Sequence, residues 1–474
     1  MGTNDTLNDL ARKMRSGRID RRQFFKGAAA LGASATAISS ALRVAPTRAQ
    51  DDGEVVFWCD FTAQDFANVQ AVAEGYNAQA TGAKVNLVQI PPGNETDVTK
   101  LMTAVRSGTG PDIYFLDRFT VAQRAADGVL QDLSELGGDD VIKNYIQFAQ
   151  SEAIYNGKVY ALPFDTDARA LYYNKGMIQS AGADPAELDP ANGAVTWDKV
   201  AEIANKLNVQ DSSGNYTQMG FIPWINQGWH YTYGFSWGGN FFDWEGCSVT
   251  PDDQPIVDAF TWVQNYCVAL DAAKVNAFGG PADLPGFDPA QHPFHLGQLA
   301  MQITGDWEIK QMEQYAPSID YGITMIPVPN AGDTSSTWAG GWSLTIPQGA
   351  KNLDEAWTAI QWMAGENGGR IYTQQSAHLP TWASLLNEGD LFEERHKFFA
   401  DMLPTAKSRP PIPVGAKYWD ELTVAWQKNN LGDGQPADLL KDVKDRVQGD
   451  LQRFCPITEP NTSTTSGPVA SPTS

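Results

Sequence analysis

VVFWC (55–59) begins the stretch of sequence that decides the fold, and IYFLDR (113–118) ends it. Both segments are compact and apolar, as expected of buried strands, and another strand-type segment covers 84–90. Between them, apolar residues recur at helical spacing over 66–76 and again over 98–106. Strand, helix, strand, helix, strand in this order predicts a mostly parallel sheet with right-handed crossovers.

The ends of these strands supply the first candidate ligand-binding residues. Ligands of parallel α/β sheets lie beyond the carboxyl ends of the strands. Asp60 and Phe61 follow the first strand, and Asp117 and Arg118 follow the last. We therefore expect these four residues at a ligand site.

Later segments repeat the α/β pattern. Thr196-Trp197-Asp198 begins a helical segment, 343–347 is of strand type and 353–364 is helical. A chain of 474 residues is too long for one efficient core. The sequence therefore predicts two α/β domains.

The first 49 residues have the form of an export signal. Asp20-Arg21-Arg22-Gln23-Phe24-Phe25-Lys26 precedes a weakly apolar segment, 27–42, that is too short and too polar to span a bilayer. Small residues at Thr47-Arg48-Ala49 offer a cleavage site. We expect a twin-arginine signal over 1–49 and a mature protein in the periplasm or outside the cell.

Charge excludes several partners. The chain has a formal net charge of −22, and residues 1–49 contain nine Lys/Arg and three Asp/Glu, so the mature chain carries −28. Such a surface repels nucleic acid and anionic lipid, and it disfavours a strongly anionic ligand. No apolar run after the signal reaches the length of a transmembrane helix. We expect no nucleic-acid partner and a soluble mature protein.

Four cysteines allow two disulfides in an oxidising compartment. Cys247 and Cys267 are favoured as one pair because they close a modest loop. Cys59 with Cys455 would then join distant parts of the chain, which the sequence does not decide. The spacing is not that of a zinc site.

Three charged residues in an extended segment indicate a polar ligand. Asp165, Asp167 and Arg169 alternate before an apolar run, so they share one face of a strand. Such a face needs either solvent or a polar partner. Carboxylates accept hydrogen bonds from hydroxyl groups and a guanidinium donates to them, so a neutral polyol fits this face.

Aromatic residues and glycines extend this interpretation to sugars. Aromatics crowd over 224–244, including Trp224 and Trp229, and most of them are expected in the core. Trp224 and Trp229 are nevertheless candidates for a ligand site, and Trp307 and Trp342 lie beside glycines, whose backbone can approach a ligand closely. Flat rings with carboxylates suit the C–H face and hydroxyl rim of a sugar. The further candidates are Asp306, Trp307, Gly341, Trp342 and Trp419.

Other chemistries fit less well. GFSWG (234–238) matches a nucleophile elbow, but a turn follows where the elbow requires a helix. His292-x-x-His295 contains a proline and predicts a surface loop rather than a metal site. Asp165 and Asp167 would lie nearly parallel, whereas glycoside hydrolysis uses carboxylates on opposite sides of a bond. We expect no cofactor, no metal and no enzymatic activity.

Five short motifs occur in order behind the export signal. They are GPDI (110–113) with DRF (117–119), VYALPFD (159–165) through YNK (173–175), AMQITGDW (300–307), GGW (340–342) before IP (346–347), and RP (409–410) with Pro413. In these motifs the chain resembles the extracellular solute-binding proteins of carbohydrate ABC transporters, the maltose-binding-protein-like family 1. The resemblance covers about 55–454.

The resemblance implies a two-lobe periplasmic-binding-protein fold with a hinge between the lobes. The first lobe would contain 50–164 and 338–378, and the second 165–337 and 379–456. Residues 457–474 are read as a disordered tail. The resemblance also implies a monomer that delivers its solute to permease subunits of the transporter.

The resemblance assigns roles to the candidates already named. Asp117 and Arg118 would contact a sugar at a strand end, Asp165 would contact it at the hinge, and Trp307 and Trp419 would stack on its ring. A polyamine or glycerol phosphate remains an alternative solute, and a secreted glycoside hydrolase an alternative function.

Overall fold

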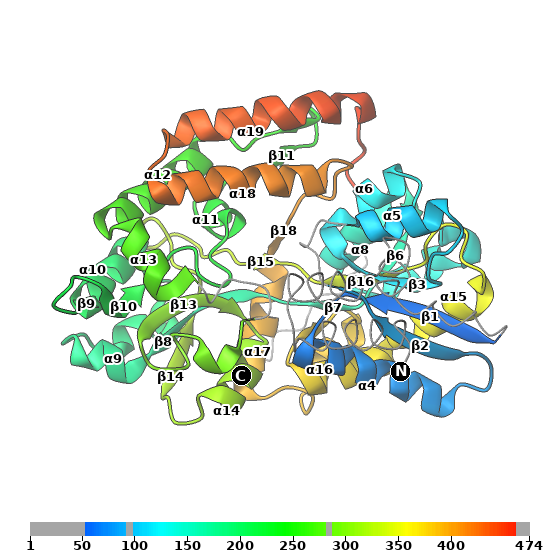
Figure 1. The fold of residues 1–474 in the computed structure, drawn as a ribbon, viewed down its shortest axis with the longest axis horizontal. Coiled ribbons are helices and arrows are strands. Elements are labelled where there is room, and N and C mark those ends of the chain that lie inside the picture. Colours follow the sequence, from blue (N-terminus) through cyan, green and yellow to red (C-terminus); the bar gives the residue numbers. More distant parts are fainter. Residues whose placement is uncertain (1–52, 92–97, 281–286, 461–474) are drawn as a thin grey trace, which may run out of the picture. The chain divides into compact units, whose positions relative to one another are not determined.

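The computed structural model describes residues 53–91, 98–280 and 287–460. The predicted export signal over 1–49 and most of the predicted tail lie outside the described residues. The described residues from Val55 onward belong to one compact unit (Figure 1). Within the described ranges, no helix has the length and apolar character needed to cross a membrane.

The first sheet contains the strands predicted from the N-terminal stretch. Its order is β2-β1-β3-β16-β6, with β1 parallel to β3 and β16 antiparallel to both β3 and β6. Its strands are β1 (Glu54–Cys59), β2 (Lys84–Gln89), β3 (Ile113–Asp117), β6 (Ala161–Pro163) and β16 (Trp342–Thr345). The strand–helix–strand–helix–strand prediction is confirmed, with α4 (Ala63–Gln79) and α5 (Thr99–Arg106) as the two helices.

The second sheet has the order β14-β8-β13-β10-β9. In this sheet β10 runs parallel to β13, whereas the pairs β10–β9, β13–β8 and β14–β8 are antiparallel. Its strands are β8 (Arg169–Asn174), β9 (Val209–Gln210), β10 (Tyr216–Phe221), β13 (Leu299–Gly305) and β14 (Tyr321–Thr324).

The predicted α/β class with two sheets is confirmed, but the sheets are mixed rather than mostly parallel. β8 and β16 are strands that enter one sheet directly from the other. A parallel neighbour requires a helical crossover, whereas a strand arriving without one is free to run the opposite way. The sequence pattern shows apolar strands but not the route by which each one enters its sheet.

Helices pack on the sheets and form two separate apolar cores. One core surrounds β1, β3 and β16, and the other surrounds β8, β10 and β13. Figure 1 shows α18 (Gly415–Leu431) and α19 (Pro436–Leu451) side by side, and these two helices are in contact. α4 is likewise in contact with α16 (Glu366–Ser376). The remaining α-helices are α6 (Val121–Ala126), α7 (Gly138–Val141), α8 (Gln147–Ala153), α9 (Lys175–Ser180), α10 (Trp197–Leu207), α11 (His230–Ser236), α12 (Gln254–Ala269), α13 (Ala272–Gly279), α14 (Glu308–Tyr315), α15 (Leu353–Met363) and α17 (Glu394–Met402).

Three segments pass between the two sheets and meet each other. β7 (Asp165–Thr166) lies between β6 and β8, and it pairs antiparallel with β17 (Leu379–Pro380). β15 (Trp338–Ala339) leads into β16 and pairs with β18 (Lys407–Ser408). We call these meeting segments, 164–169, 338–342 and 378–380, the junction.

The disulfide pairing differs from the prediction. Cys247 is bonded to Cys455, across a sequence separation of 208 residues, and Cys59 and Cys267 are buried free thiols. Cys247 precedes β12 (Ser248–Val249), which pairs with β11 (Phe242–Asp243) and packs against α19. Cys455, which follows α19, is thereby brought close to Cys247. The predicted pair Cys247–Cys267 is wrong, because Cys247 is bonded to Cys455 and Cys267 is a buried free thiol in α12. Ile457, the first residue of the predicted tail, is also buried in the second core.

The disulfide gives the first prediction. Replacing Cys247 and Cys455 together by alanine should lower the free energy of unfolding by about 2–5 kcal/mol, because a long loop in the unfolded chain is no longer closed. Urea unfolding of the wild type and the double variant, each with and without reductant, measures the effect. Reductant should destabilise the wild type and leave the variant unchanged.

A thiol count provides the control. Denatured, unreduced protein should release two thiols, from Cys59 and Cys267. A count of zero would contradict the pairing and restore the arrangement that the sequence favoured.

Candidate functional site

The predicted charged face lies at the junction. Asp165 and Asp167 are buried, and each carboxylate accepts a hydrogen bond from the neighbouring crossing segment. Asp165 Oδ1 accepts from the Trp342 backbone N–H at 2.6 Å, and Asp167 Oδ1 accepts from the Gly340 N–H at 2.7 Å. Asp167 also pairs with the Arg169 guanidinium. The alternation seen in the sequence thus joins two crossing segments through side chain and backbone.

Two glycines allow these segments to approach. Gly341 has a φ of +130°, which side chains rarely adopt, and a Cβ there would lie 2.4 Å from the Asp165 carbonyl oxygen. A Cβ on Gly340 would lie 3.2 Å from an Arg409 nitrogen and 3.3 Å from an Arg169 nitrogen. Gly341 therefore shapes the junction through its backbone.

Arg118 holds the junction from inside. Its side chain is fully buried, and it pairs with Glu152 at 2.7 Å, donates to the Asp165 carbonyl at 2.5 Å and donates to the Gly340 carbonyl. These three bonds use Nε and both terminal nitrogens. The strand-end rule predicts Arg118 at a ligand site, and in the structure its guanidinium is bonded to protein partners at the crossing segments.

Asp117 is also paired within the protein. Its Oδ1 accepts from Arg409 at 2.8 Å, and burial raises the pKa of its carboxyl while Arg409 lowers it. Arg409 lies over the rings of Phe119 and Trp419, with its guanidinium carbon 3.8 Å and 5.3 Å from the two ring centres. Asp117 and Trp419 are therefore linked through Arg409.

Two guanidinium groups lie over the Trp338 ring. The Arg169 guanidinium carbon lies 3.8 Å from its ring centre, and that of Arg409 lies 5.0 Å away. Trp419 and Trp229 continue this group, with ring centres 5.4 Å apart. Trp229 is half-buried, whereas Trp419 is buried at 6% exposure, so Trp229 is the more accessible of the pair.

A second group forms around Asp306. Its carboxylate is buried and accepts from the Trp307 and Leu379 backbone N–H groups, both at 3.1 Å. The Trp307 ring is half-buried and stacks on His378, with centres 5.1 Å apart and planes 27° apart. A Cβ on Gly305 would lie 2.0 Å from the Trp307 ring, so this glycine lets the ring adopt its position.

His378 and Asp165 face each other with unused hydrogen-bonding atoms. His378 Nδ1 lies 3.7 Å from Asp165 Oδ2 and 3.8 Å from Asp306 Oδ1, distances too long for hydrogen bonds. Among the residues that the structure describes, neither His378 Nδ1 nor Asp165 Oδ2 has a hydrogen-bond partner. A buried polar atom without a partner is costly, so a ligand group that bonds to it gains free energy.

Burial makes both groups neutral near pH 7. It raises the pKa of Asp165 to about 8, with Asp167 adding to the shift, while the bond from the Trp342 backbone opposes it. It lowers the pKa of His378 to about 4, while Asp167 opposes that shift. A protonated carboxyl can donate and a neutral imidazole nitrogen can accept. The two unpaired atoms together therefore match a hydroxyl group, which does both.

The remaining predicted site residues surround these two groups less directly. Trp342 stacks on Phe115 at 5.1 Å and contacts the Phe61 ring edge at 4.6 Å, so both aromatics pack on the first core. Asp60 Oδ1 is buried without a partner in the described ranges, and burial raises the pKa of its carboxyl. Trp224 is half-buried against the second core, with no ring stacking recorded among the described residues.

Sequence reasoning did not name four residues that the structure brings to the junction. His378 and Gln227 lie outside the motifs, and Gln227 Oε1 accepts from Arg169 Nε at 3.3 Å. Arg409 belongs to one of the five motifs and Trp338 to none of them, and neither was predicted as a site residue. Neither spacing nor burial tendency in the sequence identifies residues that meet only after three chain crossings.

The alternative chemistries have structural explanations. Ser236, the centre of the elbow-like motif, is buried in α11 and donates to the Pro327 carbonyl at 2.6 Å. The predicted surface loop at 292–295 is wrong, because both histidines are buried and His295 Nε2 lies 2.8 Å from Glu308. No cluster of metal-binding side chains occurs in the described part of the chain.

Comparisons with known proteins identify the family to which this chain belongs. The family model "Bacterial extracellular solute-binding protein" matches residues 62–369. A binding protein of Brucella abortus (strain 2308) is 26% identical over 420 residues, covering 85% of this chain and 94% of the relative. The maltotriose-binding protein of Pyrococcus abyssi is 23% identical over 411 residues, covering 84% and 83%.

A solved structure shows the same fold. CpMnBP1 with mannobiose bound has a TM-score of 0.72 and 22% identity, and the match covers 84% of this chain and 100% of that one. At this identity the likeness establishes the two-sheet fold.

The pKa of Asp165 gives a prediction for stability. In the unfolded chain this carboxyl loses its proton above its ordinary pKa, but in the folded protein it keeps the proton up to about pH 8. Its contribution to the free energy of unfolding therefore falls as pH rises from about 4 to about 8. Asp165→Asn removes this contribution, so the wild type should lose about 1 kcal/mol or more relative to the variant between these limits.

Urea unfolding at several pH values tests this difference. Asp139→Asn, at an exposed aspartate, is the control and should follow the wild type. Parallel stability curves for wild type and Asp165→Asn would show that this carboxyl titrates normally.

Proposed function

We propose that this chain, which belongs to the family of bacterial extracellular solute-binding proteins, captures a neutral sugar or oligosaccharide at the junction. It then delivers the sugar to the membrane permease subunits of an ABC importer. The relatives named for maltotriose and mannobiose binding support a saccharide as the solute.

The pair of unpaired atoms on Asp165 and His378 carries the proposal. A sugar hydroxyl can accept from the protonated carboxyl and donate to the neutral imidazole, which satisfies both buried atoms at once. An unmatched buried polar group costs about 1–3 kcal/mol, so a ligand lacking this hydroxyl is rejected. Specificity thus comes from hydrogen-bond matching rather than from charge.

Aromatic rings provide the second element of recognition. Trp307 is half-buried and follows Asp306 just beyond the end of β13. The C–H face of a sugar packs on such a ring while its hydroxyl rim reaches neighbouring polar atoms. Trp229 with Trp419 offers another ring surface for a longer saccharide.

Capture requires the junction to open. Asp165, Asp306 and Trp419 are buried, so a ligand reaches them only when the two sheets move apart around the crossing segments. A bound sugar that contacts both sides favours the closed arrangement through its differential contacts. The closed arrangement is then the one that the permease recognises.

Other solutes match the junction less well. Arg118, Arg169 and Arg409 each pair with a carboxylate, so a glycerol phosphate would have to compete with those carboxylates for a cation. A polyamine needs ionised carboxylates, whereas Asp165 keeps its proton at neutral pH. A junction with balanced charge and neutral unpaired atoms favours an uncharged ligand.

The cellular setting completes the proposal. The twin-arginine signal would export the chain, and the mature protein would act as a monomer without nucleic-acid partners and without turnover of its ligand.

Ligand titration tests the function. Tryptophan fluorescence and calorimetry with maltotriose, mannobiose, spermidine and glycerol 3-phosphate should show binding of a saccharide and no binding of the two charged solutes. Trp307→Ala and His378→Ala should each weaken saccharide binding about tenfold or more, since each removes roughly 1.4 kcal/mol of contact. Trp357→Ala, at a half-buried tryptophan of the first core, should not.

Two outcomes contradict the proposal. Unchanged affinity in both junction variants would move the site elsewhere. Release of monosaccharide from the oligosaccharides would indicate a glycoside hydrolase.

A further inference from the structure

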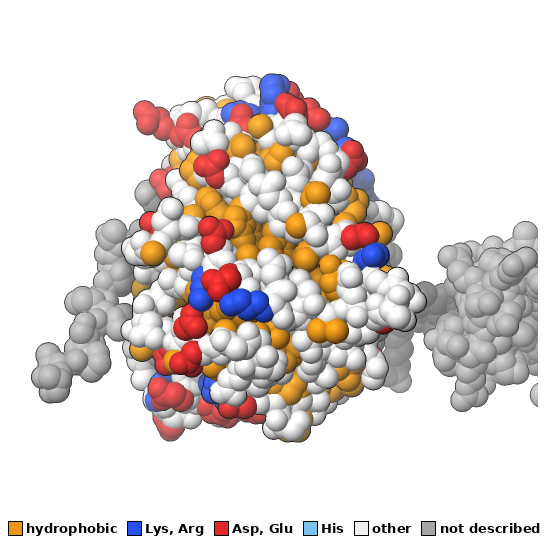
Figure 2. Space-filling view, turned by 90° about the vertical axis from the view of Figure 1, so that its left-hand side faces the viewer, with side chains coloured by type: hydrophobic (Ala, Val, Ile, Leu, Met, Phe, Trp, Pro, Cys, Tyr) orange, Lys and Arg blue, Asp and Glu red, His pale blue; other side chains and the backbone are white. Residues whose placement is uncertain are grey.

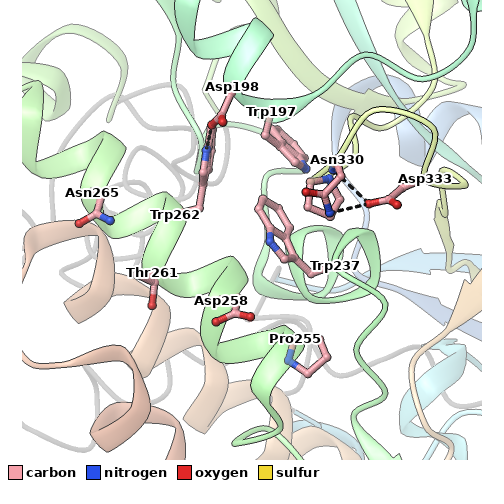
Figure 3. Close-up of a pocket in the computed structure, with 11 residues that line it drawn as sticks. Trp197, Asp198, Trp237, Pro255, Asp258, Thr261, Trp262, Asn265, Asn330 and Asp333 are labelled. Atoms are coloured by element: carbon pink, nitrogen blue, oxygen red, sulfur yellow. Dashed lines mark hydrogen bonds between the residues drawn. The ribbon is translucent and has the colours of Figure 1, made fainter.

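A hollow in the surface lies away from the junction, on the side of the second sheet. It has a volume of about 600 Å³ and lies among the start of α10, the end of α11, α12 and the loop 329–333 (Figure 3). A smaller hollow of about 340 Å³ adjoins it, and Trp262, Asp198 and Asn265 line both. Figure 2 shows that hydrophobic side chains reach the surface in a band across this side, with acidic side chains beside it. We call the two hollows together the outer groove.

Trp237 and Trp262 form the floor of the outer groove. Both rings are half-buried, with centres 5.9 Å apart and planes 46° apart. The Trp262 Nε1–H donates to Asp198 at 2.9 Å, and Trp237 stacks on the buried Trp197 at 5.8 Å. The two rings are thus held in place before any ligand arrives, which lowers the entropy cost of binding.

The rim of the outer groove carries hydrogen-bonding groups of neutral and acidic type. Asp258, Asn265 and Thr261 come from α12, and Asn330 and Asp333 face them from the loop (Figure 3). Asp258 Oδ1 accepts from Gln254 at 2.7 Å, and Asp333 Oδ2 accepts from the Asn330 N–H at 3.0 Å. Neither hollow has lysine or arginine among its lining residues within the described part of the chain.

We propose that the outer groove is a second carbohydrate-binding site, which holds a neutral saccharide chain against Trp237 and Trp262. Two adjoining rings rimmed by amide, hydroxyl and carboxylate groups match the C–H faces and hydroxyl groups of neighbouring sugar units. An anionic ligand would meet carboxylates without a compensating cation.

A cation is the chemical rival, and the ring geometry argues against it. Recognition of ammonium groups by aromatic rings needs ring faces directed at one enclosed point. Here the two rings abut each other, and Trp197 covers part of Trp237. The two rings form a surface that bends between them and has polar groups along its edge. Such a surface suits an extended ligand.

The outer groove would hold the protein near polysaccharide from which transportable sugars are released. Two sites on one chain raise the effective concentration of ligand at each. The inference does not rest on the function proposed for the junction, because no residue is shared between them.

Affinity electrophoresis of the full chain tests the proposal. Native gels containing soluble starch, galactomannan, hydroxyethylcellulose or xylan should retard the protein in at least one case. Trp262→Ala should weaken that retardation about tenfold or more, judged by the polysaccharide concentration required. Asn265→Lys fills the groove without removing a ring and should have the same effect. Trp244→Ala, at another half-buried tryptophan of the second core, is the matched control and should migrate as the wild type.

A junction variant separates the two sites. Trp307→Ala should retain the retardation while losing affinity for free oligosaccharide in calorimetry. If Trp307→Ala abolishes retardation, the junction binds the polysaccharide and the outer groove does not. No retardation by any of the four polysaccharides overturns the proposal, as does fluorescence quenching by tetramethylammonium or spermidine that Trp262→Ala removes. Retardation without any oligosaccharide binding would leave the outer groove standing and refute the junction proposal.

Discussion

The buried guanidinium of Arg118 connects three segments that are far apart in the sequence. It pairs with Glu152 in α8 and donates to backbone carbonyls in both β7 and the turn before β16. A buried charge is tolerated only when it is paired and hydrogen-bonded, so these partners and Arg118 depend on one another. Breaking a buried ion pair by removing one partner typically costs about 3–5 kcal/mol. The crossing segments therefore come together as one unit.

That constraint explains why a strongly acidic protein has an electrically balanced junction. The chain carries −22 overall, yet Arg118, Arg169 and Arg409 each meet a carboxylate there. The Asp165 carboxyl, which has no guanidinium partner for its side chain among the described residues, has its pKa raised by burial and remains protonated. Burial thus converts an acidic segment into a neutral hydrogen-bonding surface, which changes the class of ligand that it can accept.

Sequence patterns identified what local spacing encodes. The order β1–α4–β2–α5–β3 can be predicted from the sequence, because each element shows its own periodicity and crossover connections between parallel strands are right-handed. Asp165, Asp167, Arg169 and Trp307 can be predicted as candidates because charge or glycine neighbours mark them within single segments. The same patterns could not show that β8 and β16 reverse the direction of the sheets, since this depends on the path between sheets. They also could not pair Cys247 with Cys455, or place His378 beside Asp165, because those contacts join residues about 200 apart in sequence.

The aromatic run over 224–244 shows how one sequence feature can serve two surfaces. The sequence suggested a single cluster, mostly in the core, and the middle of the run does lie there: Tyr231, Tyr233 and Phe235 are buried in α11. The helix ends differ. Trp229 precedes α11 and contacts Trp419 in the group of rings beside the junction, whereas Trp237 follows the helix and forms part of the outer groove. All seven residues of α11 are buried, whereas Trp229 and Trp237 at its two ends are half-buried. Each of the two proposed sugar surfaces uses one of these flanking rings.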